Sequence, residues 1–364
     1  MALAKSNGHH ASDATSSLDA LSELYGNTFA VVKSMTVKAA MDLDRRRRRH
    51  PPPRRRRRHG PRRRQGHAPP VPCLRRLMRV LTLSGVFAVQ TPVPGYAAAP
   101  ADEAEAPVYA LTPVSRLLIG AGNQGHMMSM LLHPSFVTPF LRISDWLQRE
   151  LPGPTPLAGA CGDGRRRRRV HTIVNDGMAS DSIFTTDILV REHGEVFQRI
   201  SSLVDVAGRN GKAAQAIARA FPGVKCSVMD LAHVVAEAPG GTGVEFIAGD
   251  MFESVPPALS SSSGLCMIGV TTTVSRYKIL RNCKKAIPTK DKGGKMIIMD
   301  IVVGTAPSDQ NHRDVQILYD AYIMFINGAK RDEQEWKMHF LEAGFSDYKI
   351  MPIMGFRSII GVYP

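Results

Sequence analysis

The sequence predicts an α/β protein with a mostly parallel β-sheet, helices on both faces and a C-terminal antiparallel hairpin. Between residues 200 and 363, short apolar runs alternate with segments of about a dozen residues at helical spacing. This alternation is typical of strand–helix–strand units with right-handed crossovers. The last two apolar runs, 347–354 and 356–363, lie too close together for a helical crossover, so they should pair as a hairpin.

The individual elements follow from the same pattern. We expect helices near 173–187 and 189–199 ahead of the sheet. The strands before the hairpin are expected at 200–207, 224–230, 244–249 and 294–303. The helices between and after them are expected at 212–221, 231–238, 273–287, 310–327 and 332–343.

The expected domain boundaries follow changes in composition. Residues 1–43 carry apolar side chains at helical spacing and should form N-terminal helices. Residues 44–71 are rich in arginine and proline and should be disordered, because like charges repel and there is too little apolar surface to bury. Residues 72–150 should continue the helical region, 151–172 should form an irregular arginine-rich loop, and 173–364 should hold the sheet.

The net charge of +15 comes from local arginine runs. The 18 arginines at 45–49, 54–58, 62–64 and 165–169 contribute a charge of +18, so the remaining residues carry a formal charge of −3. No aromatic residue interleaves these runs for base stacking, so we expect no nucleic-acid partner. A tether to nucleic acid or to an anionic surface is the alternative.

The remaining composition indicates a cytoplasmic protein with reduced thiols. Its five cysteines show neither paired nor metal-ligand spacing, so we expect neither disulfides nor a bound metal. No run of about 18 apolar residues occurs, and the N-terminus lacks the apolar segment of a signal peptide. We therefore expect no membrane partner.

Three expected strand ends carry candidate ligand-binding residues. The stretch 203–211 (LVDVAGRNG) leads from an apolar strand into a small-residue turn and a helix, where backbone N–H groups can approach a ligand. The next two strands end in Asp230 and in the segment 249–252 (GDMF). Acids at successive strand ends suit an adenosine-bearing ligand, with a nicotinamide dinucleotide as a more distant alternative. The other alternative is a capping role, in which Asp230 caps the next helix and Asp250 caps its own loop.

Several stretches of the chain together match one known family. They include YALTPVSRLL at 109–118, LVDVAGRNG at 203–211, VKCSVMDLAHVV at 224–235, GVEFIAGDMFESVP at 243–256 and GGKMIIMDIVVG at 293–304. On these stretches the chain resembles the plant S-adenosylmethionine-dependent small-molecule O-methyltransferases of the caffeate and flavonoid type. The resemblance implies a Rossmann-like catalytic domain and S-adenosylmethionine as cofactor. It also implies an all-helical, incomplete winged-helix-like N-terminal domain that forms a homodimer, with the core of a monomer as the alternative.

The resemblance also assigns roles to particular residues. Ser182 would bind the methionine carboxylate of the cofactor, and Val174 and Met178 would face a phenolic acceptor, although either could be an ordinary core residue. The other residues implied in cofactor binding lie at the three strand ends: Ala207, Gly208, Asp230, Asp250, Met251 and Phe252. Ala207 stands where the family usually has glycine, and Arg209 replaces a second glycine.

The catalytic residues depart from the family pattern. Family members use a histidine base after the fourth strand, assisted by two carboxylates. Here no histidine occurs between His233 and His312, and Met267 lies near the expected position of the base. Asp300 matches the first carboxylate, whereas Lys330 stands in place of the second.

Two functions remain open on the sequence alone. The first is methyl transfer from S-adenosylmethionine to a phenolic hydroxyl of a phenylpropanoid or flavonoid, as the resemblance implies. The alternative is a catalytically impaired homologue that keeps the fold, the dimer and the cofactor site.

Overall fold

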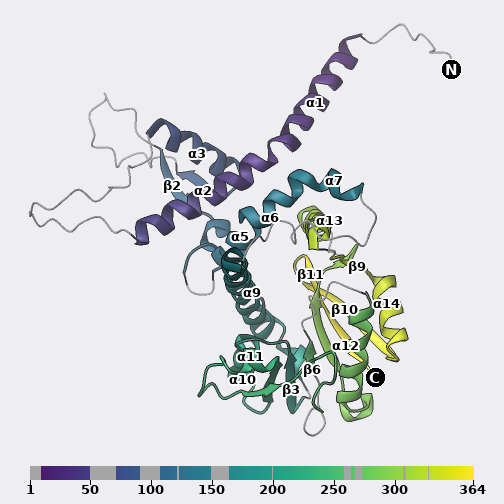
Figure 1. The fold of residues 1–364 in the computed structure, drawn as a ribbon. Helices are drawn as coiled ribbons and strands as arrows, with labels where there is room; N and C mark the ends of the chain where they lie inside the picture. Colours follow the sequence, from purple (N-terminus) through teal and green to yellow (C-terminus); the bar gives the residue numbers. More distant parts are fainter. Residues whose placement is uncertain are drawn as a thin grey trace, which may run out of the picture. The chain divides into compact units, whose positions relative to one another are not determined.

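The computed structural model forms two compact units, residues 1–132 and 133–364 (Figure 1). Their boundary lies at Leu132, whereas the change in composition placed it near residue 150. The residues that the structure describes are 10–49, 71–90, 107–120, 123–148, 164–198, 200–257, 264–266, 273–305, 309–326 and 328–364.

The N-terminal unit is mainly helical. Its helices are α1 (His10–Thr28), α2 (Ala30–Arg49), α3 (Val71–Leu83), α4 (Pro113–Arg116) and α5 (Gly125–Leu131). The expected disorder of 44–71 is wrong for its first residues, because the backbone of α2 stays helical to Arg49. Arginine is a strong helix former, and extending an existing helix costs little. Residues 50–70 lie outside the described part of the chain.

The N-terminal unit, which is helical as predicted, also contains one short pair of strands. Strands β1 (Phe87–Gln90) and β2 (Val108–Leu111) pair antiparallel in this unit, with Phe87 opposite Leu111. The Thr112 hydroxyl donates to the Gly85 carbonyl at 2.8 Å and accepts from the Ser115 amide at the start of α4. Thr112 therefore joins the end of β2 to both the turn before β1 and the next helix.

The C-terminal unit begins with helical segments. They are α6 (Pro134–Val137), the 3-10 helix η1 (Thr138–Arg142), α7 (Ile143–Leu147), α9 (Gly164–Glu192) and η2 (Gly194–Phe197). The prediction of an irregular loop over 151–172 is wrong from Gly164 onward, because the arginine run 165–169 forms the first turns of α9. Arginines favour a helix when their side chains reach solvent, and Arg168 and Arg169 are exposed.

The main sheet of the described residues has the strand order β10-β11-β7-β6-β3-β4-β5. The strands are β3 (Ser202–Val206), β4 (Lys225–Asp230), β5 (Glu245–Ala248), β6 (Gly264–Cys266), β7 (Met296–Asp300), β10 (Asp347–Met354) and β11 (Arg357–Tyr363). The strands from β3 to β7 are parallel, and β11 pairs antiparallel with both β7 and β10. The predicted Rossmann-like class with its C-terminal hairpin is confirmed.

Helices connect and cover these strands. They are α10 (Lys212–Ala220), α11 (Ala232–Val235), α12 (Thr273–Ala286), η3 (Lys290–Lys292), α13 (Gln310–Ile323), η4 (Met324–Ile326) and α14 (Glu333–Glu342). The short strands β8 (Val302–Val303) and β9 (Arg331–Asp332) form a separate parallel pair. In the part of the chain that is described, no helix combines the length and the apolar character needed to span a membrane.

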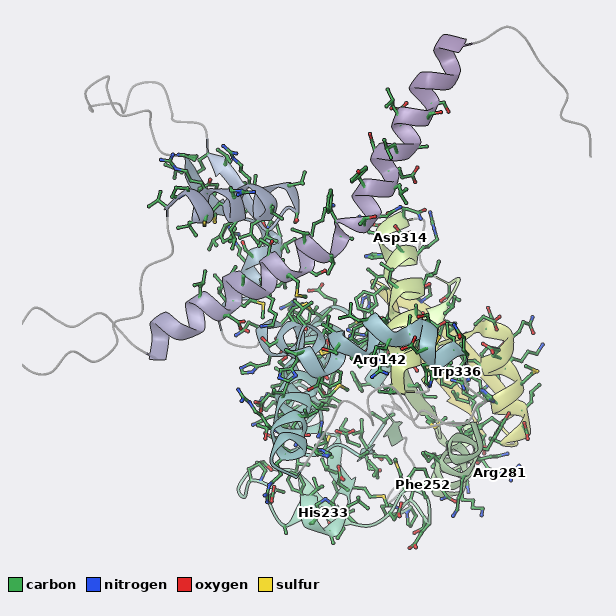
Figure 2. The ribbon with its side chains drawn as sticks, turned by 45° about the horizontal axis from the view of Figure 1, so that its top comes forward. Arg142, His233, Phe252, Arg281, Asp314 and Trp336 are labelled. Atoms are coloured by element: carbon green, nitrogen blue, oxygen red, sulfur yellow. The ribbon has the colours of Figure 1, made fainter. Side chains whose placement is uncertain are left out.

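Alternate residues along the strands enter two separate cores. Val206 and Ile298 face the core that also holds side chains of α12 and α14. Leu203 and Val228 face the opposite core, with side chains of α9 and α10. Trp336 of α14, labelled in Figure 2, is 1% exposed and belongs to the first core. Helices therefore cover both faces of the sheet, as predicted.

Strand order determines where a ligand can bind. The chain passes from β3 outward to β5, then returns to the other side of β3 to form β6. Ligands of open α/β sheets bind beside the carboxyl ends of the strands at such a reversal. The carboxyl ends of β3, β4, β5 and β7 lie at the same edge because these strands are parallel, and we call this the carboxyl edge.

Candidate cofactor site

The loop after β3 makes a tight turn into α10. Ala207, Arg209 and Gly211 all have left-handed backbone angles, with φ of 61°, 57° and 67°. The Gly211 amide donates to the Gly208 carbonyl at 2.8 Å, and α10 begins at Lys212. A side chain at Gly208 would collide with its neighbours, because a Cβ atom there would lie 2.5 Å from Asp205 Oδ2. The predicted small-residue turn therefore has a steric cause at Gly208.

Asp205 lies beneath this loop. Its side chain is 2% exposed, in a strand whose other residues are also buried. Burial and the nearby charge of Asp230 raise the pKa of Asp205 to about 7, although a hydrogen bond from the Ala214 amide opposes the shift. The sequence analysis did not select this residue. A charged residue within an otherwise apolar strand was the signal that could have found it.

The loops after β4 and β5 lie beside each other at the carboxyl edge. Asp230 is the partner of Ala248 in the register of the two parallel strands, and the Gly249 amide donates to the Asp230 carbonyl at 2.9 Å. The structure therefore brings Asp230 and the segment 249–252 together. It also joins them to the first loop, because the Arg209 amide donates to Asp230 Oδ2 at 2.9 Å.

The alternative of simple capping applies to one of the two acids. Helix α11 has Leu231, not Asp230, at its N-cap, and no side chain caps it. Asp230 Oδ1 instead accepts from the Leu231 amide at 2.8 Å. Asp250 Oδ1 accepts from the Phe252 amide at 2.8 Å, so Asp250 does cap its own loop.

These residues fit a nucleoside with free hydroxyl groups. A carboxylate offers about four acceptor positions. Backbone amides occupy one on each oxygen of Asp230, so the others can accept from ribose hydroxyls. The segment after Asp250 is held in place, because Asn282 of α12 donates to the Met251 carbonyl at 3.0 Å. Met251 and Phe252, the latter labelled in Figure 2, are half-buried against the first core and offer apolar surface to a base.

Helix α9 carries the other residues implied in cofactor and acceptor binding. Val174 and Met178 lie one turn apart, the first half-buried and the second exposed, and Ser182 follows one turn later. Two contacts link this stretch to the rest of the unit. The Arg209 guanidinium contacts Asn175 Oδ1, and Arg357 Nη2 donates to both carboxylate oxygens of Asp181 at 3.0 and 2.9 Å.

The sequence analysis predicted neither of these two side-chain contacts of α9. Arg357 starts β11 and is 176 positions away from Asp181, so no local pattern relates them. Asn175 and Arg209 are 34 positions apart. The departure from glycine at position 209 was the one signal that could have drawn attention to the second pair.

Asp300 ends β7 at the carboxyl edge, and Lys330 precedes β9. Their side chains form an ion pair and are 12% and 15% exposed. The Lys330 ammonium also lies 5.3 Å from the centre of the Tyr319 ring on α13, within cation–π distance. Lys330 thus neutralises the charge of Asp300. Met267 and the expected position of the base lie outside the described residues.

Metal ligation has no support in the described part of the chain. There, no group of three or more His, Cys, Asp or Glu side chains is placed to hold a metal ion. Cys73, Cys226 and Cys283 are free thiols, the first exposed and the other two buried.

The sequence comparisons with known proteins agree on one family. The O-methyltransferase domain profile matches residues 155–346. The O-methyltransferase ZRP4 of Zea mays is 48% identical, with 95% of this chain and 96% of that protein covered. The 5-pentadecatrienyl resorcinol O-methyltransferase of Sorghum bicolor is 41% identical, with 97% and 98% covered. Among solved structures, the SAH-bound form of CalO1, a methyltransferase in calicheamicin biosynthesis, has a TM-score of 0.71 at 20% identity, with 95% of this chain and 99% of that one covered.

Proposed function

The chain belongs to the family of plant S-adenosylmethionine-dependent small-molecule O-methyltransferases, and on that premise we propose that it methylates a phenolic hydroxyl of a phenylpropanoid or flavonoid. The observation that carries the proposal is the convergence of the Gly208 loop, Asp230, Asp250 and Asp300 at one edge of the sheet. This edge offers acceptors for a nucleoside on β4 and β5, and a carboxylate on β7, which β6 and β3 separate from β4.

When bound, S-adenosylmethionine would supply an electrophilic methyl group for transfer to the acceptor oxygen. The residues of the chain have three tasks. Asp230 and Asp250 hold the nucleoside, and Ser182 with the loop after β3 holds the amino-acid end. Val174 and Met178 orient the aromatic acceptor so that its oxygen faces the methyl group. Asp300 is the carboxylate available to attract the phenolic proton, which then passes to solvent.

Two measurements test this function in sequence. Calorimetric titration with S-adenosylhomocysteine should give saturable binding that Asp230→Asn weakens by at least tenfold, because the amide cannot accept from two hydroxyls as a carboxylate does. Methyl transfer from labelled donor is then measured on caffeate, a flavonoid and an alkyl resorcinol. An absence of both binding and thermal shift with S-adenosylhomocysteine would refute the cofactor site.

A catalytically impaired homologue is the second candidate, and the Lys330–Asp300 ion pair favours it. The Lys330 ammonium contacts Asp300 Oδ1, so this oxygen is already engaged and is not free to accept a phenolic proton. If this candidate is correct, S-adenosylhomocysteine binds but turnover stays at background with every acceptor. Turnover well above background across the panel would refute it.

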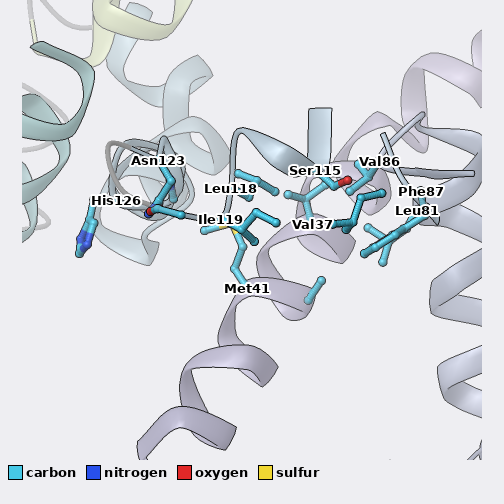
Figure 3. Close-up of a pocket in the computed structure, with 14 residues that line it drawn as sticks. Val37, Met41, Leu81, Val86, Phe87, Ser115, Leu118, Ile119, Asn123 and His126 are labelled. Carbon is cyan, nitrogen blue, oxygen red and sulfur yellow. The ribbon is translucent and has the colours of Figure 1, made fainter. Parts of the chain in front are cut away.

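We further propose that the chain acts as a cytoplasmic homodimer joined through its N-terminal unit. Leu18, Leu21, Leu24 and Tyr25 follow one another along α1 and are all exposed. The same unit contains a cavity of about 450 Å³ lined mainly by apolar side chains, among them Met41 and Ile119 (Figure 3). Apolar surface of this extent on a helix is typical of a protein–protein contact.

Sedimentation velocity tests the dimer. The Leu21→Asp, Leu24→Asp double variant should sediment as a monomer, because it places two charges on the apolar face of α1. Ser22→Asp is the matched control, since it adds a charge to the same helix at an already polar, exposed position. A monomeric wild-type chain at micromolar concentration would contradict the proposal.

A further inference from the structure

Arg209 has a backbone conformation that does not suit its side chain. Apart from Ala207 and Arg209, every residue with a left-handed backbone in the described part of the chain is a glycine. A residue with a Cβ atom is strained in this region, and such strain concentrates at functional sites. A contact made by the arginine side chain would explain why a non-glycine residue occupies this strained position.

The Arg209 side chain extends from the cofactor loop to α9. Its guanidinium contacts Asn175 Oδ1, while its backbone amide is held by Asp230 Oδ2 at 2.9 Å. Asn175, Met178 and Ser182 are spaced three and seven residues apart along α9, so they lie on one face of that helix. Arg209 is therefore directed at the face of α9 that carries the residues implied in binding the amino-acid end of the cofactor and the acceptor.

The charge of Arg209 is not neutralised by the described residues. Arg357 and Arg191 each form an ion pair with a carboxylate, whereas the side-chain partner of Arg209 is a neutral amide and no described carboxylate forms an ion pair with it. A guanidinium has five N–H donors, and the contact with Asn175 uses one of its nitrogens. The half-buried side chain thus presents a cation with unused donors beside the cofactor loop.

We propose that Arg209 binds a carboxylate of the ligand that occupies the carboxyl edge. A guanidinium is suited to this role because its two parallel N–H groups match the two oxygens of a carboxylate. The carboxylate is either that of the amino-acid end of the cofactor or one carried by the acceptor. This inference rests on the proposed function, because it requires the cofactor to bind at this edge.

Paired ligands separate the two sources. S-adenosylhomocysteine carries the amino-acid carboxylate, whereas 5′-methylthioadenosine has the same nucleoside and thioether without it. If the cofactor carboxylate is the partner, Arg209→Gln should lower the affinity for S-adenosylhomocysteine by about tenfold in calorimetry. The affinity for 5′-methylthioadenosine should fall by less than twofold. If the acceptor carboxylate is the partner, Arg209→Gln should leave both nucleosides unchanged. The variant should then lower the affinity for caffeate, which carries a carboxylate, but not for catechol, which carries none, when each binds the complex with S-adenosylhomocysteine.

Two further variants separate binding from structure. Arg209→Gly removes the side chain and the left-handed strain together, so it should raise Tm by about 2–4 °C while reproducing the loss of carboxylate affinity. Arg219→Gln removes an exposed arginine near the end of α10 and should change neither affinity nor Tm.

The possible failures are distinguishable. If wild-type protein binds neither nucleoside, the proposed cofactor site is wrong, and the inference falls with it. If wild-type protein binds both, the inference is overturned by an Arg209→Gln variant that keeps wild-type affinity for every carboxylate, or that loses S-adenosylhomocysteine and 5′-methylthioadenosine equally.

Discussion

Asp205 lies directly beneath Gly208: a Cβ atom at Gly208 would be 2.5 Å from Oδ2 and 2.6 Å from Cγ of the buried Asp205 side chain. The same Cβ atom would also lie 3.0 Å from Cγ1 of Val228 on the neighbouring strand. Because these neighbours belong to the packed sheet, the loop after β3 can take its present path only with glycine at position 208.

Gly208→Ala should destabilise the protein and displace the loop. We expect the free energy of unfolding to fall by about 2–3 kcal/mol, as for other additions to a close-packed interior. Affinity for S-adenosylhomocysteine should fall with it, because the loop carries Arg209 and reaches Asp230. Urea unfolding and calorimetry measure the two effects. Gly223→Ala is the control, since a Cβ there meets nothing within 4 Å and should cost less than about 0.5 kcal/mol. Equal losses in both variants would contradict this account.

Asp205 should make stability fall as pH rises toward neutrality. Burial, followed by the charge of Asp230, raises the pKa of Asp205 from its ordinary 3.8 to about 7. Between these values the folded chain holds a proton that the unfolded chain has lost. The contribution is therefore complete below pH 3.8 and is lost by about pH 7, with a total of roughly 4 kcal/mol.

Asp205→Asn tests this pH dependence without changing the size of the side chain. The difference in unfolding free energy between variant and wild type, measured in urea from pH 5 to pH 8, should shift in favour of the variant as pH rises. A pH-independent difference for Asp205→Asn would show that Asp205 does not titrate in this range.

Part of the fold could be predicted from the sequence. Periodicity placed β3, β4, β5, β7, β10 and β11 within a few residues, because each is an apolar run between turns, whereas β6 and β9 were not predicted. It failed where an arginine run sits next to a helix. The segment 165–169 has no apolar pattern, and only the continuation of α9 from its apolar residues makes it helical. Strands β1 and β2 have only four residues each, too few for periodicity alone to identify them.

The candidate site divides in the same way. The positions of Asp230 and Asp250 follow from their places at the ends of parallel strands, so the sequence was sufficient to predict that they meet. The ion pair between Asp181 and Arg357 could not be predicted, because only the folded chain brings the middle of α9 to the start of β11. The contact between Lys330 and Asp300 was also invisible, although both residues had been selected one by one.

The Lys330–Asp300 ion pair should show strong energetic coupling. Because both side chains are largely buried, removing one partner leaves the other charge unpaired in a poorly solvated place. In a double-mutant cycle with Lys330→Met and Asp300→Asn, we expect a coupling of about 1–3 kcal/mol by urea unfolding. The Lys290–Asp347 pair is the control: its side chains are more than half exposed, and its coupling should stay below about 1 kcal/mol. Similar coupling in the two pairs would contradict a special role for burial at Asp300.

His339 should act on stability in the opposite direction from Asp205. Its Nε2 accepts from Arg331 Nε at 2.7 Å and its Nδ1 lies 2.7 Å from the Tyr277 hydroxyl, so the ring is neutral in this network. Burial, followed by the charge of Arg331, lowers the pKa of His339 below its ordinary 6.5. Below pH 6.5 the unfolded chain therefore takes up a proton that the folded chain refuses, and stability is lost as pH falls.

The contributions of Asp205 and His339 to the pH dependence of stability should partly cancel in the wild-type protein between pH 5 and pH 6.5. In this range Asp205 makes the protein more stable as pH falls, whereas His339 makes it less stable. His339→Gln keeps a polar side chain but cannot titrate. Relative to wild type it should therefore gain stability as pH falls through this window, whereas Asp205→Asn should lose it. If His339→Gln and Asp205→Asn change with pH in the same direction, then one of these two protonation states has been assigned wrongly.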